Sequence, residues 1–164
     1  LSDFHKYSTM DDLYLYLEFD TFKNIDETSL YLNKLIKRSK KNNAQYWFIK
    51  LKNEDKVVGT FGLLNIDFYR KSAEIGYGVS PEFWGRGIFK NSCKLVLKHM
   101  FNTLNFHKIF AITDCRNINS ITSLEKIGFK FEAKLRDYYF YKNEKWVDAQ
   151  VLSIFDYDYK DLYQ

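Results

Sequence analysis

Residues 74–87 of this chain of 164 residues read EIGYGVSPEFWGRG, and this stretch decides the fold. The segment 72–79 is typical of a β-strand, and from Phe89 onward apolar residues recur at helical spacing. Between the two lie Gly85 and Gly87, whose freedom to adopt positive φ lets a backbone approach a ligand closely. Because the free amides of a first helical turn point outward at the positive end of the helix dipole, the stretch predicts an anion site that suits phosphate.

The two common phosphate-binding fingerprints do not fit this stretch. A Walker loop needs Gly-Lys followed by Ser or Thr, and residues 87–89 are Gly, Ile and Phe. A dinucleotide fingerprint needs G-x-G-x-x-G after a strand, whereas Gly76 and Gly78 lie inside the predicted strand and the next pair begins only at Gly85. Taken alone, the glycines are equally compatible with an ordinary strand end followed by a helix turn.

The rest of the chain alternates helical and strand patterns without a repeat or a linker, so we expect one domain over residues 1–164. Helices are expected from Ser8 or Thr9, from a cap at Asp26 to about Lys40, from Phe89 to Leu104, and over 118–127, closed by Gly128. Strands are expected over 45–51, 57–64, 72–79 and 108–113, followed by a hairpin of 130–141 and 145–155. Turn-like segments join the first three strands, which predicts consecutive antiparallel pairing in a mixed α/β (α+β) sheet.

Composition narrows the class of protein. Lys and Arg number 25 against 21 Asp and Glu, a net charge of +4, and the lysines are scattered without a nucleic-acid motif, so no nucleic-acid partner is expected. Cys93 and Cys115 are too few for a disulfide framework, and no Cys or His spacing predicts a metal site. No apolar run approaches the ~18 residues of a membrane helix. We therefore expect a globular cytoplasmic protein with reduced thiols, no metal and no membrane partner.

Three groups of residues occur in an order that a known family shares. They are Gly76-Tyr77 with Pro81 and Trp84-Gly85-Arg86-Gly87; Asn117 and Ser120 with Glu125-Lys126-Ile127-Gly128-Phe129; and Glu132-Ala133 with Arg136 and Asp148. In these motifs nearly the whole chain resembles the GNAT superfamily of N-acetyltransferases, and within it the branch of ribosomal-protein (Rim-type) N-terminal acetyltransferases. The resemblance implies a GNAT-like fold, with a central, mostly antiparallel sheet, helices on both faces and a C-terminal hairpin. It also implies a first strand that would precede Leu1.

The resemblance implies that acetyl-CoA binds as co-substrate and that its acetyl group passes directly to a primary amine in a ternary complex. The pyrophosphate would lie on the amides of Arg86, Gly87, Ile88, Phe89 and Lys90, beside Trp84 and Gly85. The pantetheine arm would run along the backbone of Tyr77, Gly78 and Val79 and reach Asn117 and Ser120, and Ser120 would protonate the leaving sulfur. Phe89 departs from the family, which has Gly or Ala there, and its place in the apolar stripe predicts that its ring faces the core.

An amine with a pKa of about 10 must lose a proton before it attacks a thioester, so the site needs a base. Glu74 is the first candidate, because strand alternation puts it on the face of Gly76 and Gly78, where missing side chains leave room for substrate. An exposed strand carboxylate, or one paired with a lysine, is an equally good interpretation of Glu74. Glu132 and Asp148 are the alternative bases.

The acceptor is the part of the function that the residues define least. Tyr138 and Tyr139 are candidates to line its pocket or to act as acids, although both could simply pack. A protein N-terminus or an amino sugar is the expected acceptor, and a polyamine ranks third because acidic residues concentrate only at 156–161. Asn117 and Ser120 also fit an ordinary helix cap. The competing hypothesis is a non-catalytic CoA-binding or protein-interaction module of the same fold; we expect a monomer or a homodimer.

Overall fold

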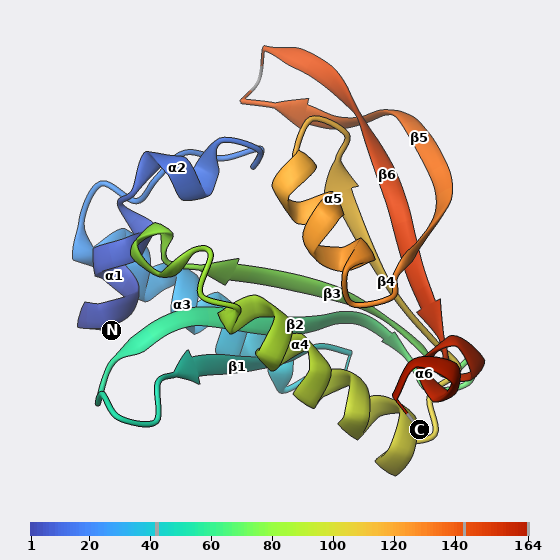
Figure 1. Ribbon diagram of the computed structural model, residues 1–164. Coiled ribbons are helices and arrows are strands. Elements are labelled where there is room, and N and C mark those ends of the chain that lie inside the picture. Colours follow the sequence, from blue (N-terminus) through green and yellow to red (C-terminus); the bar gives the residue numbers. More distant parts are fainter. Residues whose placement is uncertain (42, 143, 164) are drawn as a thin grey trace.

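The structure is a computed structural model that describes residues 1–41, 43–142 and 144–163. These residues form a six-stranded sheet in the order β1-β2-β3-β4-β6-β5, with helices on both faces (Figure 1). The strands are β1 (Gln45–Lys50), β2 (Val57–Asp67), β3 (Ser72–Val79), β4 (Lys108–Asp114), β5 (Lys130–Tyr141) and β6 (Lys145–Phe155). The helices are α1 (Ser2–Ser8), α2 (Asp11–Tyr14), α3 (Ile25–Ser39), α4 (Ile88–Lys98), α5 (Ile118–Glu125) and α6 (Asp156–Tyr163), with a 3₁₀ turn η1 (Pro81–Phe83) and a π-helical turn η2 (His99–Thr103). The mixed α/β architecture predicted from the sequence is confirmed.

The two faces of the sheet are covered by different parts of the chain. The helices α4, α5 and α6 pack on one face, where their apolar side chains build the main core with strand residues such as Phe61, Ile75 and Ile154. Burying each such side chain contributes roughly 1.5–3 kcal/mol. The helices α1 and α3 pack against β2 and β1 on the other face, where the rings of Phe4 and Tyr31 stack. Figure 1 shows the N-terminal helices on one side of β3, and α5 with the hairpin β5-β6 on the other.

The pairing of the strands changes in the middle of the sheet. The strands β1, β2 and β3 pair antiparallel in sequence order, as predicted, and β6 pairs antiparallel with both β4 and β5. The strands β3 and β4 run parallel, and Ser72–Glu74 pair with Lys108–Phe110. Beyond these positions no pairing between β3 and β4 occurs in the described residues, so the two strands separate. The sheet therefore opens at the carboxyl ends of two parallel strands, the edge where open α/β sheets bind ligands.

The N-terminal helices do not begin where the sequence indicates. A start at Ser8 or Thr9 is predicted, whereas α1 ends at Ser8 and α2 begins at Asp11. The hydroxyl of Ser8 donates to the carbonyl of His5, and that of Thr9 to the carbonyl of Lys6, both at 3.0 Å. These hydroxyls therefore satisfy free carbonyls at the end of a helix, a role that sequence alone does not distinguish from an N-cap.

The cap of α3 is Asn24, and the prediction of Asp26 is wrong. The side-chain oxygen of Asn24 accepts a hydrogen bond from the amide of Glu27 at 3.0 Å. In return, the carboxylate of Glu27 accepts one from the amide of Lys23 at 2.8 Å. This reciprocal arrangement satisfies two free amides, whereas Asp26 sits in the first turn and complements the helix dipole.

The C-terminal half follows the prediction more closely, with one helix missed. The hairpin strands β5 and β6 have the predicted bounds, and the helix predicted over 89–104 is α-helical to Lys98 and continues as the π-helical turn η2. The sequence does not predict α6, which depends on distant contacts: the ring of Tyr159 packs 5.1 Å from that of Phe101, and the hydroxyl of Tyr163 donates to the carbonyl of Ile127 at 2.7 Å. Among the described residues, no helix combines the length and apolar character needed to cross a membrane.

Candidate functional site

The open edge of β3 presents a defined set of backbone groups. The amide of Ser80 donates to the carbonyl of Val58 at 2.8 Å, and β2 and β3 pair without a shift from there to Glu74. In an antiparallel ladder, alternate residues turn their backbone groups to the same neighbour, so those of Gly78 face β2. Those of Tyr77 and Val79 then face the opening toward β4. The carbonyl of Val79 is occupied, because Nε1 of Trp84 donates to it at 2.7 Å.

The turn that follows β3 ends in a row of helix amides. Gly85 and Gly87 adopt φ of +74° and +72°, a region that favours glycine, and apart from the adjoining backbone no atom of the described residues lies within 4 Å of where a Cβ would stand on either. Gly87 is the N-cap of α4, and no described side chain caps this helix. The amides of Ile88, Phe89 and Lys90 occupy its first turn and have no intrahelical acceptor. The predicted anion site is thus an open turn with three outward-facing amides.

Two cations lie on one aromatic ring beside this turn. The guanidinium carbon of Arg86 and Nζ of Lys56 are each 5.0 Å from the centre of the Phe83 ring. Lys56 also pairs with Glu82 at 3.7 Å. Arg86 is exposed and forms no ion pair with a carboxylate of the described residues, so its charge is available to an anion on the adjacent amides.

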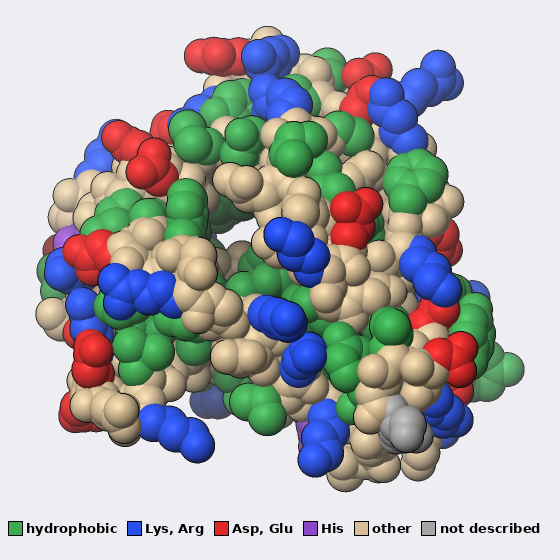
Figure 2. Space-filling model, viewed as in Figure 1, with side chains coloured by type: hydrophobic (Ala, Val, Ile, Leu, Met, Phe, Trp, Pro, Cys, Tyr) green, Lys and Arg blue, Asp and Glu red, His purple; other side chains and the backbone are tan. Residues whose placement is uncertain are grey.

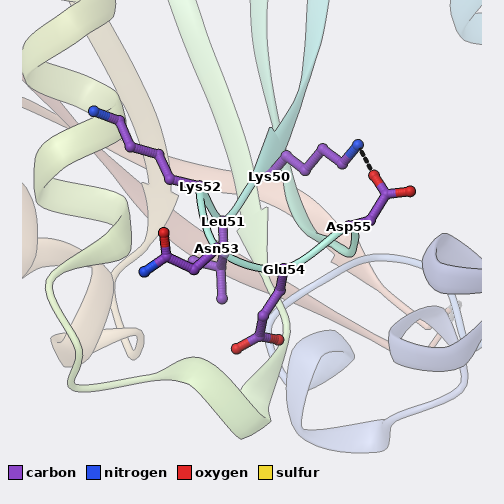
Figure 3. Close-up of a pocket in the computed structure, with 6 residues that line it drawn as sticks. All are labelled: Lys50, Leu51, Lys52, Asn53, Glu54 and Asp55. Atoms are coloured by element: carbon purple, nitrogen blue, oxygen red, sulfur yellow. Dashed lines mark ion pairs between the residues drawn. The ribbon is translucent and has the colours of Figure 1, made fainter.

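The turn between β1 and β2 adjoins the same loop. Leu51 packs against an apolar cluster that contains Val79 and Phe83. Figure 3 shows the residues Lys50–Asp55 of this turn around a depression of about 380 Å³, with Lys50 paired to Asp55 and Lys52 pointing away from that pair. This depression is lined by none of the residues predicted for the site, and we assign it no role in the reaction.

Phe89 faces the core, as predicted from the apolar stripe. Its ring packs against the main core and stacks on that of Tyr77, with centroids 3.9 Å apart and planes inclined by 28°. The ring of Phe61 also stacks on that of Phe89, with centroids 6.4 Å apart. Since the ring turns inward, it does not cover the outward-facing amides of the first turn of α4.

Ser120 lies at the opening and belongs to a group of three hydroxyls. The hydroxyl oxygens of Tyr77 and Ser120 are 2.7 Å apart, and the hydroxyl of Thr113 donates to that of Ser120 at 3.3 Å. Asn117 caps α5, because its side-chain oxygen accepts from the amide of Ser120 at 3.1 Å. Asn117 thus acts as an ordinary helix cap, one of the two interpretations of this residue from the sequence. Ser120, in contrast, contacts residues of both separated strands, Tyr77 on β3 and Thr113 on β4.

Glu74 lies on the other face of β3, together with Gly76 and Gly78, in agreement with strand alternation. Nδ2 of Asn65 donates to its carboxylate at 2.7 Å, from a residue whose φ of +48° is the left-handed conformation that Asn tolerates. Burial raises the pKa of Glu74, against the smaller opposing effects of the Asn65 hydrogen bond and the charge of Arg38. A raised pKa brings a carboxylate closer to the range useful for a base near neutral pH.

The two alternative bases are both engaged by lysines. Nζ of Lys108 lies 2.5 Å from the carboxylate of Glu132, and this hydrogen bond lowers the pKa of Glu132. Nζ of Lys134 lies 2.7 Å from Asp148, and this contact lowers the pKa of Asp148. Because a paired carboxylate with a lowered pKa is a weaker base, the geometry favours Glu74 over both.

Tyr138 and Tyr139 lie near Glu74. Their rings are perpendicular, with centroids 4.8 Å apart, and the hydroxyl of Tyr139 donates to the carbonyl of Ile112 on β4 at 3.2 Å. The pKa of each tyrosine is raised, chiefly by burial and further by the negative charges of Glu74 and Glu18. The carboxylates of Glu74 and Glu18 therefore both lie close enough to this pair of tyrosines to raise the pKa of each hydroxyl. Glu18 was not predicted as part of the site, because it is distant in sequence from every motif.

The segment after α2 is tied to the hairpin across the opening. Glu18 accepts a hydrogen bond from the amide of Phe140 at 3.0 Å, the hydroxyl of Tyr141 donates to the carbonyl of Leu15 at 2.9 Å, and Lys142 pairs with Asp20 at 3.0 Å. Figure 2 shows the molecule hollowed between the N-terminal part and the part that carries α5. The hollow is thus bounded by β3, by α5 and by this tied segment.

The predicted residues fall into two groups on either side of β3. Toward α4 and α5 lie the amides of 86–90, the open edge of 77–79, and Ser120 with its cap Asn117. On the other face lie Glu74 and the tyrosine pair. The side chains that sequence reasoning missed are Thr113, Asn65 and Glu18, each of which carries no motif and is placed only by the fold.

Comparison with known proteins agrees with this geometry. Residues 3–130 match the acetyltransferase (GNAT) domain family. The chain is 28% identical over 144 residues to the "uncharacterized N-acetyltransferase p20" of Bacillus licheniformis, which covers 88% of this chain and 80% of that protein.

Two solved structures share the fold. Spermidine N-acetyltransferase from Vibrio cholerae, in complex with CoA and spermine, gives a TM-score of 0.79 at 23% identity, covering 95% of this chain and 89% of that one. The ribosomal-protein-S5-alanine acetyltransferase from Vibrio fischeri gives 0.77 at 25% identity, covering 94% and 86%. The similarity therefore extends over almost the whole chain.

Proposed function

The chain belongs to the acetyltransferase (GNAT) family, and from this premise we propose that its acceptor is a small cationic amine, which attacks acetyl-CoA directly in a ternary complex. Membership makes the protein an acetyl-CoA-dependent N-acetyltransferase acting on amines, so the enzymatic hypothesis replaces that of a non-catalytic module. The acceptor class, the arrangement of acetyl-CoA and the roles of single residues are the proposal, and each is supported by the contacts described above.

Acetyl-CoA would lie along the open side of β3. Its pyrophosphate would take the amides of 86–90, where Gly85 and Gly87 leave open space and Arg86 adds a positive charge. Its pantetheine arm would fill the gap beside Tyr77 and Val79 in the manner of an added strand. Because the Val79 carbonyl is bound by Trp84, the arm would meet the amide of Val79, which can also polarise the acetyl carbonyl. Gly78 would offer the arm no backbone hydrogen bond, because the ladder turns its backbone groups to β2, and a Cβ on Gly78 would lie 3.5 Å from the side chain of Leu13.

Glu74 would take the proton of the attacking ammonium group, directly or through water. Its carboxylate is held by Asn65, and its raised pKa follows from burial. Lysines engage Glu132 and Asp148, whereas among the described residues Glu74 is hydrogen-bonded by the neutral side-chain amide of Asn65. The amine would therefore approach from the side of β3 opposite the amide nest.

One feature carries the choice of a cationic acceptor: Glu18, whose carboxylate accepts from the amide of Phe140 next to Tyr139, and Glu74 are two carboxylates near the perpendicular rings of Tyr138 and Tyr139. Two carboxylates and two aromatic faces form a setting that favours ammonium groups. A substrate with two amines could place one at Glu74 and a second near Glu18. This arrangement supports a polyamine, and the Vibrio cholerae neighbour is a spermidine N-acetyltransferase bound to CoA and spermine.

A protein N-terminus is the second candidate acceptor. The motif around Trp84 and the hairpin residues Glu132, Arg136 and Asp148 resemble the Rim-type branch, and the fold is also that of a ribosomal-protein-S5-alanine acetyltransferase. An α-amine needs one base and one carbonyl-polarising amide, both of which the site offers. A second carboxylate at Glu18 adds nothing for such an acceptor, which is why we rank it after the polyamine.

A thiol-release assay with the purified protein and acetyl-CoA tests the proposal. Spermidine, a peptide with a free N-terminal amine and glucosamine are compared as acceptors, with free thiol as the readout. We expect the highest kcat/KM with spermidine. A higher kcat/KM with the peptide or with glucosamine would contradict the proposed acceptor class and assign the site to that acceptor instead.

A further inference from the structure

Three hydroxyls meet at the opening between β3 and β4, and sequence analysis predicts a side-chain role for only one of them, that of Ser120. Ser120, on α5, lies 2.7 Å from the hydroxyl of Tyr77 on β3 and accepts from Thr113 on β4 at 3.3 Å. The three residues come from the three elements that border the gap. Whatever occupies the gap between the strands therefore meets this group.

The number of protons in the group restricts how it can be arranged. A serine hydroxyl has one proton to donate and two lone pairs to accept with. Thr113 already donates to Ser120. A phenol is more acidic than an aliphatic hydroxyl, so in the short contact between the two Tyr77 is the better donor. With both lone pairs of Ser120 occupied in this way, its single proton is directed to a third partner.

The ring of Tyr77 is held in place on its other side. It stacks on Phe89 at 3.9 Å and lies 6.1 Å from Phe61, with planes inclined by 28° and 21°. Its hydroxyl therefore has little freedom to leave Ser120. The stack therefore ties Tyr77 to the first turn of α4, where Phe89 lies.

Burial keeps Tyr77 in its neutral, donating form. Desolvation raises the pKa of Tyr77, and the opposing effect of the Ser120 hydrogen bond is smaller. The phenol therefore stays protonated at neutral pH and can donate a hydrogen bond without giving up its proton.

We propose that Tyr77 is a positioning residue that holds the hydroxyl proton of Ser120 toward the sulfur of CoA, so that the thiolate leaves against a ready hydrogen-bond donor. The inference rests on the proposed function, since it requires CoA in the gap. In the reaction, the amine nitrogen forms a bond to the acetyl carbon, the carbon–sulfur bond breaks, and its electron pair goes to sulfur. The proton of the ammonium passes to Glu74 or water, and the thiolate accepts the Ser120 hydrogen bond until it is protonated from solvent. Tyr77 keeps its proton throughout.

The direct test is the pKa of the CoA thiol when CoA is bound. The reference is the pKa of the CoA thiol free in solution, measured in the same buffer. The ultraviolet absorbance of the thiolate, followed against pH with bound CoA, is expected to show a pKa lowered by about one unit, as a hydrogen bond to a charged acceptor would give. Ser120→Ala should raise the pKa of the bound thiol to that of free CoA. Tyr77→Phe, which keeps the stack on Phe89, should raise it most of the way to that value.

Two controls separate this role from a structural one. Tyr163→Phe removes another tyrosine hydrogen bond, from the half-buried hydroxyl of Tyr163 on α6 to the carbonyl of Ile127 just after α5, and should leave the thiol pKa unchanged. The affinity for desulfo-CoA, which lacks the sulfur, should be the same for wild type, Tyr77→Phe and Ser120→Ala. In turnover, Tyr77→Phe should lower kcat several-fold with KM for acetyl-CoA unchanged, and the double variant should be no slower than Ser120→Ala.

A bound thiol with the pKa of free CoA in the wild-type protein would overturn the inference, and so would a Tyr77→Phe variant that matches wild type. Equal weakening of CoA and desulfo-CoA by Tyr77→Phe would also overturn it, because the tyrosine would then only shape the gap. If the wild-type protein binds neither CoA nor desulfo-CoA, the proposed function itself fails, and this outcome is recognised from the binding measurement alone.

Discussion

The rings of Tyr77 and Phe89 lie face to face, with centroids 3.9 Å apart and planes inclined by 28°. Tyr77 belongs to the open edge of β3, and Phe89 to the first turn of α4. The contact therefore joins the strand that would hold the pantetheine arm to the helix turn that would hold the pyrophosphate. A stacked pair of this kind contributes roughly 0.5–1.5 kcal/mol beyond the burial of its surface.

Phe89→Ala removes the ring that stacks on Tyr77, and we expect it to destabilise this protein. The ring packs against the main core, and its loss leaves Tyr77 without its neighbour. The free energy of unfolding, measured by urea denaturation, should fall by about 2–3 kcal/mol, below the full cost of a completely buried Phe because this ring is partly exposed. Phe89→Leu should lose less. Equal stability of Phe89→Ala and wild type would show that the stack is not structural.

Gly87 allows a matched test of the amide nest. Its φ is +72°, so Gly87→Ala and Gly87→Trp incur the same backbone strain of ~1–2 kcal/mol in the free energy of unfolding. Apart from the adjoining backbone, no atom of the described residues lies within 4 Å of the added Cβ, so neither side chain clashes at its Cβ with a more distant part of the chain. We expect Gly87→Trp alone to weaken binding of acetyl-CoA, by at least about tenfold, or ~1.4 kcal/mol. Calorimetric titration measures this difference, and equal affinities in the two variants would place the pyrophosphate elsewhere.

Local patterns predicted most of the sheet. The hairpin strands and β3 have the predicted bounds, because alternation and turn residues act over a few positions, and the same alternation put Glu74 on the face of Gly76 and Gly78. The start of α1 was wrong, because Ser8 and Thr9 can serve a carbonyl as well as an amide. The roles of these hydroxyls depend on the direction in which the chain continues, which their own sequence does not specify.

The side chains around the acceptor could not be predicted from neighbours in sequence. The acidic residues of the sequence concentrate at 156–161, but these side chains are engaged elsewhere: Asp156 hydrogen-bonds His107 at 2.9 Å and Asp158 pairs with Lys130 at 2.5 Å. Glu18 and Glu74 are far apart in the chain, and the fold brings both near one tyrosine pair. Such clustering of charge is visible only in the tertiary structure. It is the reason that we propose a polyamine as the first candidate acceptor, although the sequence alone ranked it third.

The stability of wild type relative to Glu74→Gln should depend on pH. Burial raises the pKa of Glu74 in the folded state, so between the ordinary and the raised pKa the folded state binds more protons than the unfolded one. The free energy of unfolding contributed by this group therefore falls as pH rises through that window. Because Gln does not titrate and can still accept from Asn65, the variant should gain stability relative to wild type as pH rises from about 4 and then level off. Urea unfolding at a series of pH values measures the difference, and a constant difference would contradict it.

The same substitution should remove the acid limb of the rate profile. In wild type, kcat should fall as pH drops through the raised pKa of Glu74, because the protonated carboxyl cannot accept the proton of the amine. Glu74→Gln should lower kcat about 100-fold near neutral pH, the usual contribution of a general base, with KM for acetyl-CoA unchanged. Glu132→Gln is the matched control, since Glu132 is held by Lys108. A larger loss of kcat in Glu132→Gln would transfer the role of base to that residue.

Glu18→Gln tests whether the second carboxylate recognises charge. The amide oxygen of Gln can still accept from the amide of Phe140, so the segment after α2 should stay tied to the hairpin while the negative charge is lost. We expect KM for spermidine to rise about threefold to tenfold, with the difference from wild type shrinking at high salt because screening weakens the attraction of exposed charges. The KM for a peptide amine that lacks a second cation should not change.

Glu54→Gln is the control variant. It removes a negative charge in the turn between β1 and β2, away from the opening, and should change the KM for neither acceptor. An equal rise of KM for both acceptors in Glu18→Gln would mean that Glu18 only holds the segment in place, and that the acceptor site discriminates by shape and not by charge.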